Sequence, residues 1–110
     1  MNMINSVQTC FRKYVDFSGR ASRSEYWWFI LFCLIIEIIA YQLNQNIYVI
    51  VVLALLLPSL AVLVRRLHDS NSSGWWALLV LVPIVGPLVL LYFMVIKGTP
   101  GPNNYGVPTL

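Results

Sequence analysis

The chain has 110 residues, of which 59% are hydrophobic and only 10% are charged, and its formal net charge is +3 at pH 7. This length allows one domain, and soluble domains carry about 25% charged residues. So few charged side chains cannot cover a soluble globule, which excludes intrinsic disorder, a disulfide scaffold and an ordinary cytosolic enzyme. The composition predicts a single integral membrane domain over residues 1–110.

Residues 1–25 precede the first long apolar segment and are expected to form a cytoplasmic amphipathic segment. Apolar side chains recur there at spacings of three, four and three, which is one face of a helix: Ile4, Val7, Phe11 and Tyr14. A short helix of this kind lies on a membrane surface. Ser22 and Glu25 match a capping box, in which each side chain bonds the backbone of the other, so the next helix should begin near Arg23.

Three apolar segments follow, at residues 26–43, 47–64 and 75–96. The first contains one charged residue, Glu37, and the other two contain none. About 20 helical residues cross a hydrocarbon core of about 30 Å. The prediction is therefore an all-α membrane protein with a short amphipathic N-terminal helix and three transmembrane helices.

The third apolar segment contains Pro83 and Pro87, each of which removes a backbone donor. The preferred prediction is a single span kinked at these two prolines, because neighbouring groups can satisfy the freed carbonyls. The alternative is a re-entrant hairpin, which leaves the tail on the cytoplasmic side. Residues 97–110 are rich in glycine and proline and are expected to form an extended tail.

The distribution of lysine and arginine predicts the orientation. Six basic residues fall on one side of a three-span protein: Arg12, Lys13, Arg20, Arg23, Arg65 and Arg66. The opposite side receives only Lys97. By the positive-inside rule, the N-terminus is then cytoplasmic and the C-terminus periplasmic.

Three sequence blocks carry a family resemblance. They are Phe17 to Phe29, which reads FSGRASRSEYWWF; Arg65 to Asp69 with the later Ser73-Gly74-Trp75-Trp76; and Gly98 to Gly101 with Asn103 and Tyr105-Gly106. With all three in order, the chain resembles the "domain of unknown function 805" family of small bacterial inner-membrane proteins. The resemblance implies a multi-pass protein of the bacterial inner membrane and brings no assigned activity, catalytic residue or cofactor.

A basic cluster with two possible uses is expected at the cytoplasmic face. Its candidate lipid- or partner-binding residues are Arg20, Arg23, Arg65, Arg66, His68 and Asp69. Guanidinium groups match phosphate oxygens, which favours anionic lipid headgroups as ligands. Arg65 and Asp69 are four apart, which predicts a pair if the second span continues as a helix past the membrane. The alternative use is an enzyme acting on a lipid headgroup, with His68 and Asp69 as base and orienter, although adjacent helical residues do not face each other and no catalytic residue is assigned.

Glu37 is the one charged residue within a predicted span, where an ionised side chain is costly. Cys33, Glu37, Tyr41 and Asn44 share a helix face, and we expect that face to contact protein, with Glu37 either protonated or paired across an oligomer interface. The alternative is a transport or proton-conducting assembly that uses Glu37.

The preferred function is a non-enzymatic membrane component that binds lipids or partners. The expected partners are the lipid bilayer, anionic headgroups, and a homo-oligomer or other membrane proteins. Nucleic acid is not expected, because no basic stripe is interleaved with exposed aromatics. A single histidine without a second at metal-ligand spacing predicts no metal site, and no cofactor is expected.

Overall fold

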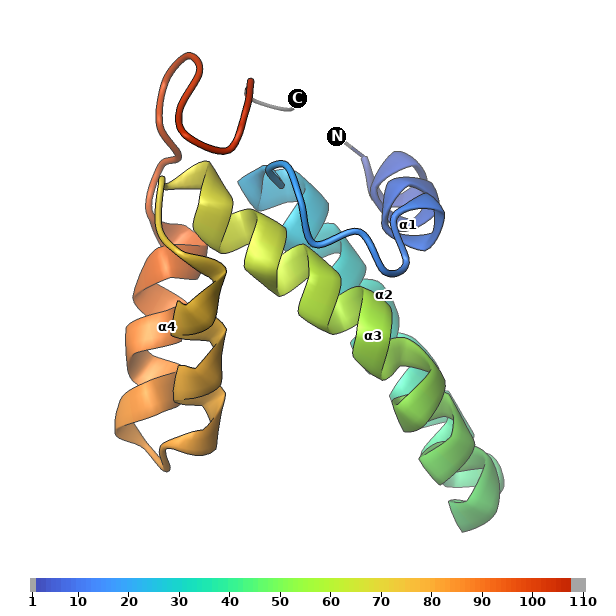
Figure 1. The fold of residues 1–110 in the computed structure, drawn as a ribbon. Coiled ribbons are helices and arrows are strands. Elements are labelled where there is room, and N and C mark those ends of the chain that lie inside the picture. The colour runs from blue at the N-terminus through green and yellow to red at the C-terminus, as the bar shows by residue number, and fades with distance from the viewer. Residues whose placement is uncertain (1, 108–110) are drawn as a thin grey trace.

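The computed structural model describes residues 2–107, which form helices connected by turns and one longer loop and followed by an irregular tail (Figure 1). The elements in chain order are α1 Met3–Arg12, α2 Arg23–Leu43, α3 Gln45–Asp69, the 3-10 helix η1 Gly74–Leu81 and α4 Val85–Val95. Among the described residues, β-type pairing is confined to one antiparallel bridge between Asn103 and Gly106. The predicted all-α class is confirmed.

Helix α1 packs against α2 through small side chains. The Oδ1 atom of Asn2 accepts a hydrogen bond from the Asn5 amide at 2.8 Å and so caps the helix. The buried residues of α1 are Ser6, Thr9 and Cys10. The predicted apolar face is only partly the packed one, since Ile4 is 68% exposed and Phe11 is 40% exposed. Small residues allow two helices to approach closely, and the exposed apolar residues suit a helix at a membrane surface.

Helices α2 and α3 form an antiparallel pair joined at Asn44. The side chain of Ser22 accepts a hydrogen bond from the Glu25 amide at 3.2 Å, which confirms half of the predicted capping box. Asn44 ends α2, and its side chain caps α3 by accepting from the Asn46 amide at 2.7 Å. At 1.5 Å per residue the helices are about 31 and 37 Å long. Both are long and apolar enough to cross a membrane, and most of their surface is not buried within the protein.

Pro58 lies inside α3, and Tyr14 compensates for its missing amide. A helical amide at position 58 would bond the carbonyl of Ala54, four residues earlier. The Tyr14 hydroxyl donates a hydrogen bond to that Ala54 carbonyl instead. The hydroxyl of the adjacent Ser59 lies 3.7 Å from the Cys33 thiol instead. The segment after α1 is therefore fastened to the middle of α3.

The third apolar segment is a hairpin, so the prediction of a single kinked span at residues 75–96 is wrong. Helix η1 ends at Leu81, and α4 begins at Val85. Ile84, between them, has a φ of 67°, a conformation that reverses the chain and that β-branched residues rarely adopt. At about 2.0 Å per residue for η1 and 1.5 Å for α4, each arm is about 16 Å long, half of a bilayer core.

The two arms of the hairpin lie side by side (Figure 1). Gly86 makes this possible, because a Cβ atom there would lie 1.6 Å from the carbonyl oxygen of Leu79. Prolines at positions 83 and 87 supply no amide donors, so a helix continuing through this region would lose two of its hydrogen bonds. The prolines end one helix and start the next instead of bending one helix.

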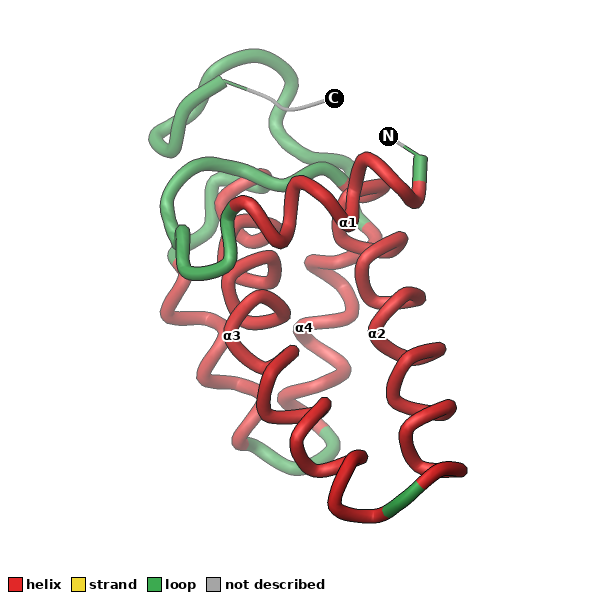
Figure 2. The backbone as a smooth tube through the Cα atoms, turned by 90° about the vertical axis from the view of Figure 1, so that its right-hand side faces the viewer, coloured by secondary structure: helices red, strands yellow, loops and turns green. Residues whose placement is uncertain are grey.

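The hairpin returns the tail to the end of the helix pair that carries Asp69. The Thr99 amide donates to the Asp69 carbonyl oxygen at 2.7 Å. Figure 2 shows the loop after α1, the α3–η1 turn and the tail gathered at one end, with the α2–α3 turn at the other. This contradicts the prediction that the tail and the Arg65–Arg66 segment lie at opposite ends.

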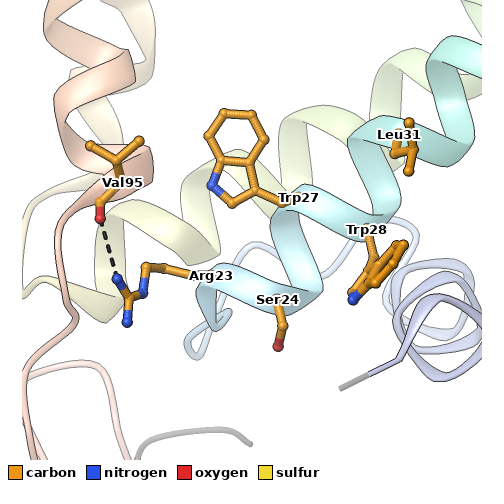
Figure 3. A pocket seen from close by; sticks show the side chains of 6 residues that line it. All are labelled: Arg23, Ser24, Trp27, Trp28, Leu31 and Val95. Carbon is orange, nitrogen blue, oxygen red and sulfur yellow. Dashed lines mark hydrogen bonds between the residues drawn. The ribbon is translucent and has the colours of Figure 1, made fainter.

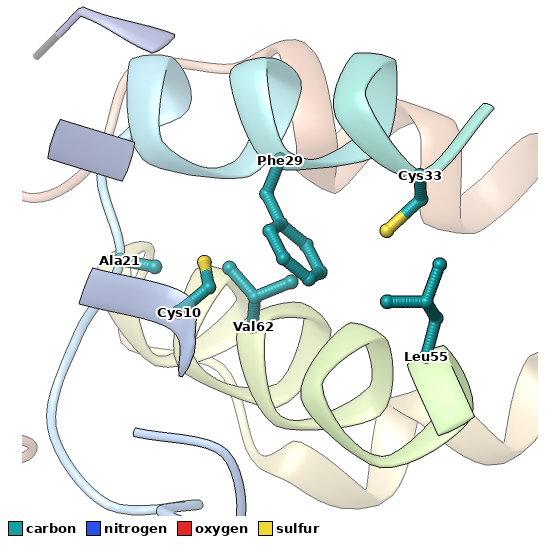
Figure 4. Packing of buried hydrophobic residues seen from close by; sticks show 6 residues of the cluster. All are labelled: Cys10, Ala21, Phe29, Cys33, Leu55 and Val62. Carbon is teal, nitrogen blue, oxygen red and sulfur yellow. The ribbon is translucent and has the colours of Figure 1, made fainter. Parts of the chain in front are cut away.

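Two buried clusters hold the helices together. The first joins α1, α2 and α3 around Phe29, which points from α2 into the space between the helices (Figure 4). The second joins α3 to the hairpin. Their buried members are Cys10, Ala21, Phe29, Cys33, Leu55 and Val62 in the first, and Leu67, Ala77, Leu90 and Met94 in the second. Helix α1 and the hairpin therefore pack on the helix pair through separate buried clusters.

Candidate functional site

Three arginines and two carboxylates are buried in two ion-paired groups on either side of the end of α3. We call this set the arginine cluster: Arg20, Arg65, Arg66, Glu25 and Asp69. It contains one more positive than negative charge. Buried charges need partners, because removing them from water is costly. The contacts of each arginine show how far that need is met.

Arg20 is bound on every side by protein acceptors. Its Nε donates to a carboxylate oxygen of Asp69 at 2.9 Å, and its Nη2 donates to the Asp69 carbonyl at 3.2 Å and the Thr99 carbonyl at 2.6 Å. Its Nη1 donates to the carbonyls of Gly101 at 2.7 Å and Gly106 at 3.3 Å. An arginine has five N–H donors, and these five contacts account for them. Arg20 therefore holds the tail against α3.

Arg66 shares Asp69 with Arg20. Its Nη1 donates to the second carboxylate oxygen of Asp69 at 2.6 Å, and its Nη2 donates to the carbonyl of Ile96 at the end of α4. Asp69 therefore pairs with Arg66, three residues away, and with Arg20. The predicted pairing of Arg65 with Asp69 is wrong. Adjacent arginines point in different directions on a helix, and only Arg66 faces the hairpin.

Arg65 pairs with Glu25 on the other side of α3. Its Nη1 donates to Oε2 of Glu25, and both side chains are fully buried. The Cys10 thiol from α1 donates to the same Glu25 oxygen at 3.8 Å. Burial, reinforced by the negative charge of Glu25, raises the pKa of the Cys10 thiol to about 12. The capping box predicted that the Glu25 side chain bonds the start of its own helix, but it bonds Arg65 of α3 instead.

The imidazole ring of His68 contacts the C-terminal tail. Its Nδ1 lies 2.9 Å from the Gly19 carbonyl, and its ring stacks on that of Tyr105 with centroids 3.9 Å apart. The side-chain amide of Asn103 donates to the His68 carbonyl at 3.0 Å. His68 and Asp69 therefore act on different partners, and the ring has no contact with the Asp69 carboxylate among the described residues. Within residues 2–107, no group of three or more histidine, cysteine and acidic side chains is placed to hold a metal ion.

Arg23 differs from the other three arginines of the predicted site because it is exposed. It lines a groove of about 550 Å³ between the start of α2 and the end of α4. The lining residues are Arg23, Ser24, Trp27, Trp28, Leu31 and Val95 (Figure 3). Nη1 of Arg23 lies 3.5 Å from the Val95 carbonyl, and the Trp27 indole donates to the Met94 carbonyl at 3.0 Å. The groove is therefore lined by one cationic side chain and two indole rings.

Glu37 lies far from the arginine cluster, toward the α2–α3 turn. It is half-buried in a groove of about 240 Å³ that we call the Glu37 groove. The lining residues are Leu34, Glu37, Ile38, Tyr41, Gln42 and Tyr48. Of the predicted polar stripe, Tyr41 lines the groove with Glu37, whereas Cys33 is buried toward Ser59 of α3.

The structure buries five of the six predicted cytoplasmic site residues and leaves Arg23 exposed. The five have separate partners: Arg20 and Arg66 pair with Asp69, Arg65 pairs with Glu25, and His68 stacks on Tyr105. Sequence reasoning missed the roles of Glu25 and Cys10, and that of the tail through Thr99 and Tyr105. A buried partner for Arg65 was not evident because Glu25 is 40 residues away and already fits a local capping pattern. Gly98 was a usable signal for the tail, since a Cβ there would lie 1.9 Å from an Asp69 carboxylate oxygen.

Comparison with known proteins places these features in a family. The model of the family described as "Protein of unknown function (DUF805)" matches residues 14–107. The chain is 45% identical over 102 residues to inner membrane protein YhaI of Escherichia coli K12, covering 86% of each chain. It is 41% identical over 109 residues to inner membrane protein YhaH of the same strain, covering 86% of this chain and 88% of that one. No solved structure matches the chain.

Proposed function

This chain belongs to the family of proteins of unknown function DUF805, and on that premise we propose that it is a non-enzymatic inner-membrane protein that binds an anionic lipid headgroup at the groove beside Arg23. The membrane location is supported by the names of its relatives YhaI and YhaH. It is also supported by two helices of sufficient length and hydropathy to span a bilayer.

The exposure of Arg23 is the observation that carries the lipid proposal. Arg20, Arg65 and Arg66 are at most 1% exposed, so their guanidinium groups serve the fold. Among residues 2–107, the one hydrogen bond from the Arg23 side chain goes to the Val95 carbonyl at 3.5 Å, and Arg23 lines the groove. A guanidinium presents a planar fork of donors that matches phosphate oxygens.

The walls of the groove suit the rest of a phospholipid. Trp27 and Trp28 are 40% and 38% exposed, and tryptophan favours the boundary between headgroups and hydrocarbon. Leu31 lies about one turn beyond Trp27 along α2, in the direction an acyl chain would follow. The proposed ligand is therefore a phospholipid with net negative charge, its phosphate at Arg23 and its upper acyl chain along Trp27 and Leu31.

The charge distribution supports a topology in which this groove faces the cytoplasmic leaflet. With the hairpin returning the tail, Lys97 follows the residue whose carbonyl accepts from Arg66, so it lies at the same end of the helix pair as Arg20, Arg23, Arg65 and Arg66. The positive-inside rule then assigns this end to the cytoplasm. The proposal is two spanning helices, α2 and α3, and a re-entrant hairpin, with both termini cytoplasmic. The inner leaflet of the membrane carries the negative surface potential that attracts basic residues.

Lipid retention on purification tests the proposal. Arg23→Gln should lower the fraction of protein carrying phosphatidylglycerol, measured by native mass spectrometry from mild detergent. One basic residue near an anionic surface contributes about 1 kcal/mol, so the expected loss of affinity is about fivefold. Arg23→Lys keeps the charge but loses the fork, and should retain less lipid than the parent.

Arg12→Gln is the matched control. Arg12 is also an exposed arginine, on α1, and it does not line the groove. General charge attraction predicts equal losses from Arg12→Gln and Arg23→Gln, and that result would remove the specific site. A loss confined to Arg23→Gln supports it.

A further inference from the structure

The Glu37 groove is the second polar feature on the membrane-facing surface of α2, and the lipid proposal does not use it. Glu37 lies 14 residues beyond Arg23 on the same helix, which is about 21 Å along the axis. Among residues 2–107, no side chain forms a hydrogen bond or an ion pair with its carboxyl group. A carboxyl group at membrane depth needs a partner, because lipid tails offer none.

This chain cannot supply a basic partner for Glu37 from within. No lysine or arginine lies between Arg23 and Arg65 in the sequence, so neither α2 nor α3 carries a basic side chain near the α2–α3 turn. The groove is also too small for a lipid headgroup, since its 240 Å³ lies below the range of about 300–1,000 Å³ of pockets that hold small molecules. Its size suits one or two protruding side chains.

A second copy of the chain can supply a hydrogen-bonding partner for Glu37 at the same depth in the membrane. A copy inserted in the same orientation presents its own Glu37 at the same depth. Two carboxyl groups that share a proton are donor and acceptor to each other. The Gln42 side chain, at the rim of the same groove, adds an amide that can donate to either carboxyl. A two-fold axis through the groove makes these contacts self-complementary, as a closed dimer requires.

The apolar residues of the groove complete the contact. Leu34 and Ile38 are 52% and 53% exposed and flank Glu37 on the same face of α2. Packing and interhelical hydrogen bonds drive helix association in lipid. We propose that the Glu37 groove is the interface of a parallel homodimer in which the α2 helices contact each other and the two Glu37 carboxyl groups are hydrogen-bonded.

Disulfide cross-linking in membranes tests this proposal with a matched pair of positions. Both variants are made in full-length protein with Cys10→Ser and Cys33→Ala. Ile38→Cys places a thiol in the groove, and Ile39→Cys places one outside it at the same depth. The two isoleucines are 53% and 52% exposed, so accessibility does not distinguish them. After mild oxidation of native membranes, Ile38→Cys should give at least tenfold more covalent dimer than Ile39→Cys.

Substitutions at Glu37, combined with Ile38→Cys, test the role of the carboxyl. Glu37→Gln keeps a donor and an acceptor and should retain cross-linking near the parent level. Glu37→Leu keeps the span apolar, so the protein still inserts, but should reduce cross-linking at least fivefold. Loss in both variants would assign the interface to a charged Glu37 bound by a basic helix of another protein, which overturns the proposal.

The mass of the protein in a lipid nanodisc gives an independent reading. A dimer mass that falls to a monomer mass in Glu37→Leu supports the proposal. A monomer mass for the parent chain, or equal cross-linking at Ile38→Cys and Ile39→Cys, overturns it. Because neither assay depends on Arg23, failure of this proposal leaves the lipid proposal untouched.

Discussion

Neutralising Asp69 should destabilise the protein more than any exposed charge change, because this carboxylate serves two buried arginines. Asp69→Asn keeps the shape of the side chain and removes its charge. Its two oxygens accept from Arg20 at 2.9 Å and Arg66 at 2.6 Å, and both arginines are at most 1% exposed. Removing one partner of a buried ion pair costs about 3–5 kcal/mol. The variant leaves two guanidinium groups without a counter-charge, so we expect a loss at or above the lower limit of that range.

The thermal midpoint reports this loss. A change of 1 kcal/mol moves the midpoint of a domain of 60–100 residues by about 4–8 °C, so the expected decrease is at least about 12 °C. Tryptophan fluorescence on heating in a mild detergent measures it. Asp16→Asn is the control, because Asp16 is a half-exposed carboxylate whose partner is the neighbouring Ser18, and its loss should cost no more than about 1 kcal/mol. Equal midpoints for the two variants would refute the structural role of the arginine cluster.

Two further predictions concern the segment at the start of the chain. Tyr14→Phe should lower the free energy of unfolding of the parent by about 1 kcal/mol, because it removes the hydrogen bond to the Ala54 carbonyl. The same change should cost little in a Pro58→Ala background, because alanine at position 58 has a backbone amide that can bond this carbonyl. A double-mutant cycle on thermal midpoints measures the coupling between the two positions, and additive effects would contradict it. The raised pKa of Cys10, about 12 against 9.0 for a free thiol, means that the folded state holds its proton more tightly than the unfolded state. Stability from this group is therefore complete below pH 9 and is lost as the pH rises from 9 toward 12; Cys10→Ala should remove that part of the alkaline decline, and an identical decline in both proteins would contradict the assignment.

The parts of the fold that depend on local sequence were predictable. Apolar runs of 18 residues, the cap at Ser22 and the short turn at Asn44 determine α2 and α3 without help from distant contacts. The third apolar segment was not determined in this way, because Pro83 and Pro87 are compatible with either a kink or a reversal. The choice depends on Ile84 adopting a positive φ and on Gly86 allowing close contact between the arms.

The candidate site was predictable in its residues but not in its pairing. Their spacing in the sequence placed Arg65, Arg66 and Asp69 at the end of one predicted helix. Glu37 was identified because it is the one charged residue within a predicted span. Which arginine meets which carboxylate depends on the rotation of α3 against α2 and on the position of the tail. No local pattern contains that information, so Glu25 as the partner of Arg65 required the structure.

The candidate site depends on the hairpin, which returns the chain to the end of the helix pair that carries the arginine cluster. Only then can Arg20 bond the tail, and only then can Arg23 and Val95 line one groove. Cysteine accessibility tests this directly. In protein with Cys10 and Cys33 replaced, Asn46→Cys at the α2–α3 turn and Asn104→Cys in the tail are each exposed. They are labelled in spheroplasts with a membrane-impermeant maleimide, before and after permeabilisation. The hairpin predicts that Asn46→Cys reacts in intact spheroplasts, whereas Asn104→Cys reacts only after permeabilisation. Labelling of both positions in intact spheroplasts would mean that the third segment crosses the membrane, and it would contradict this account.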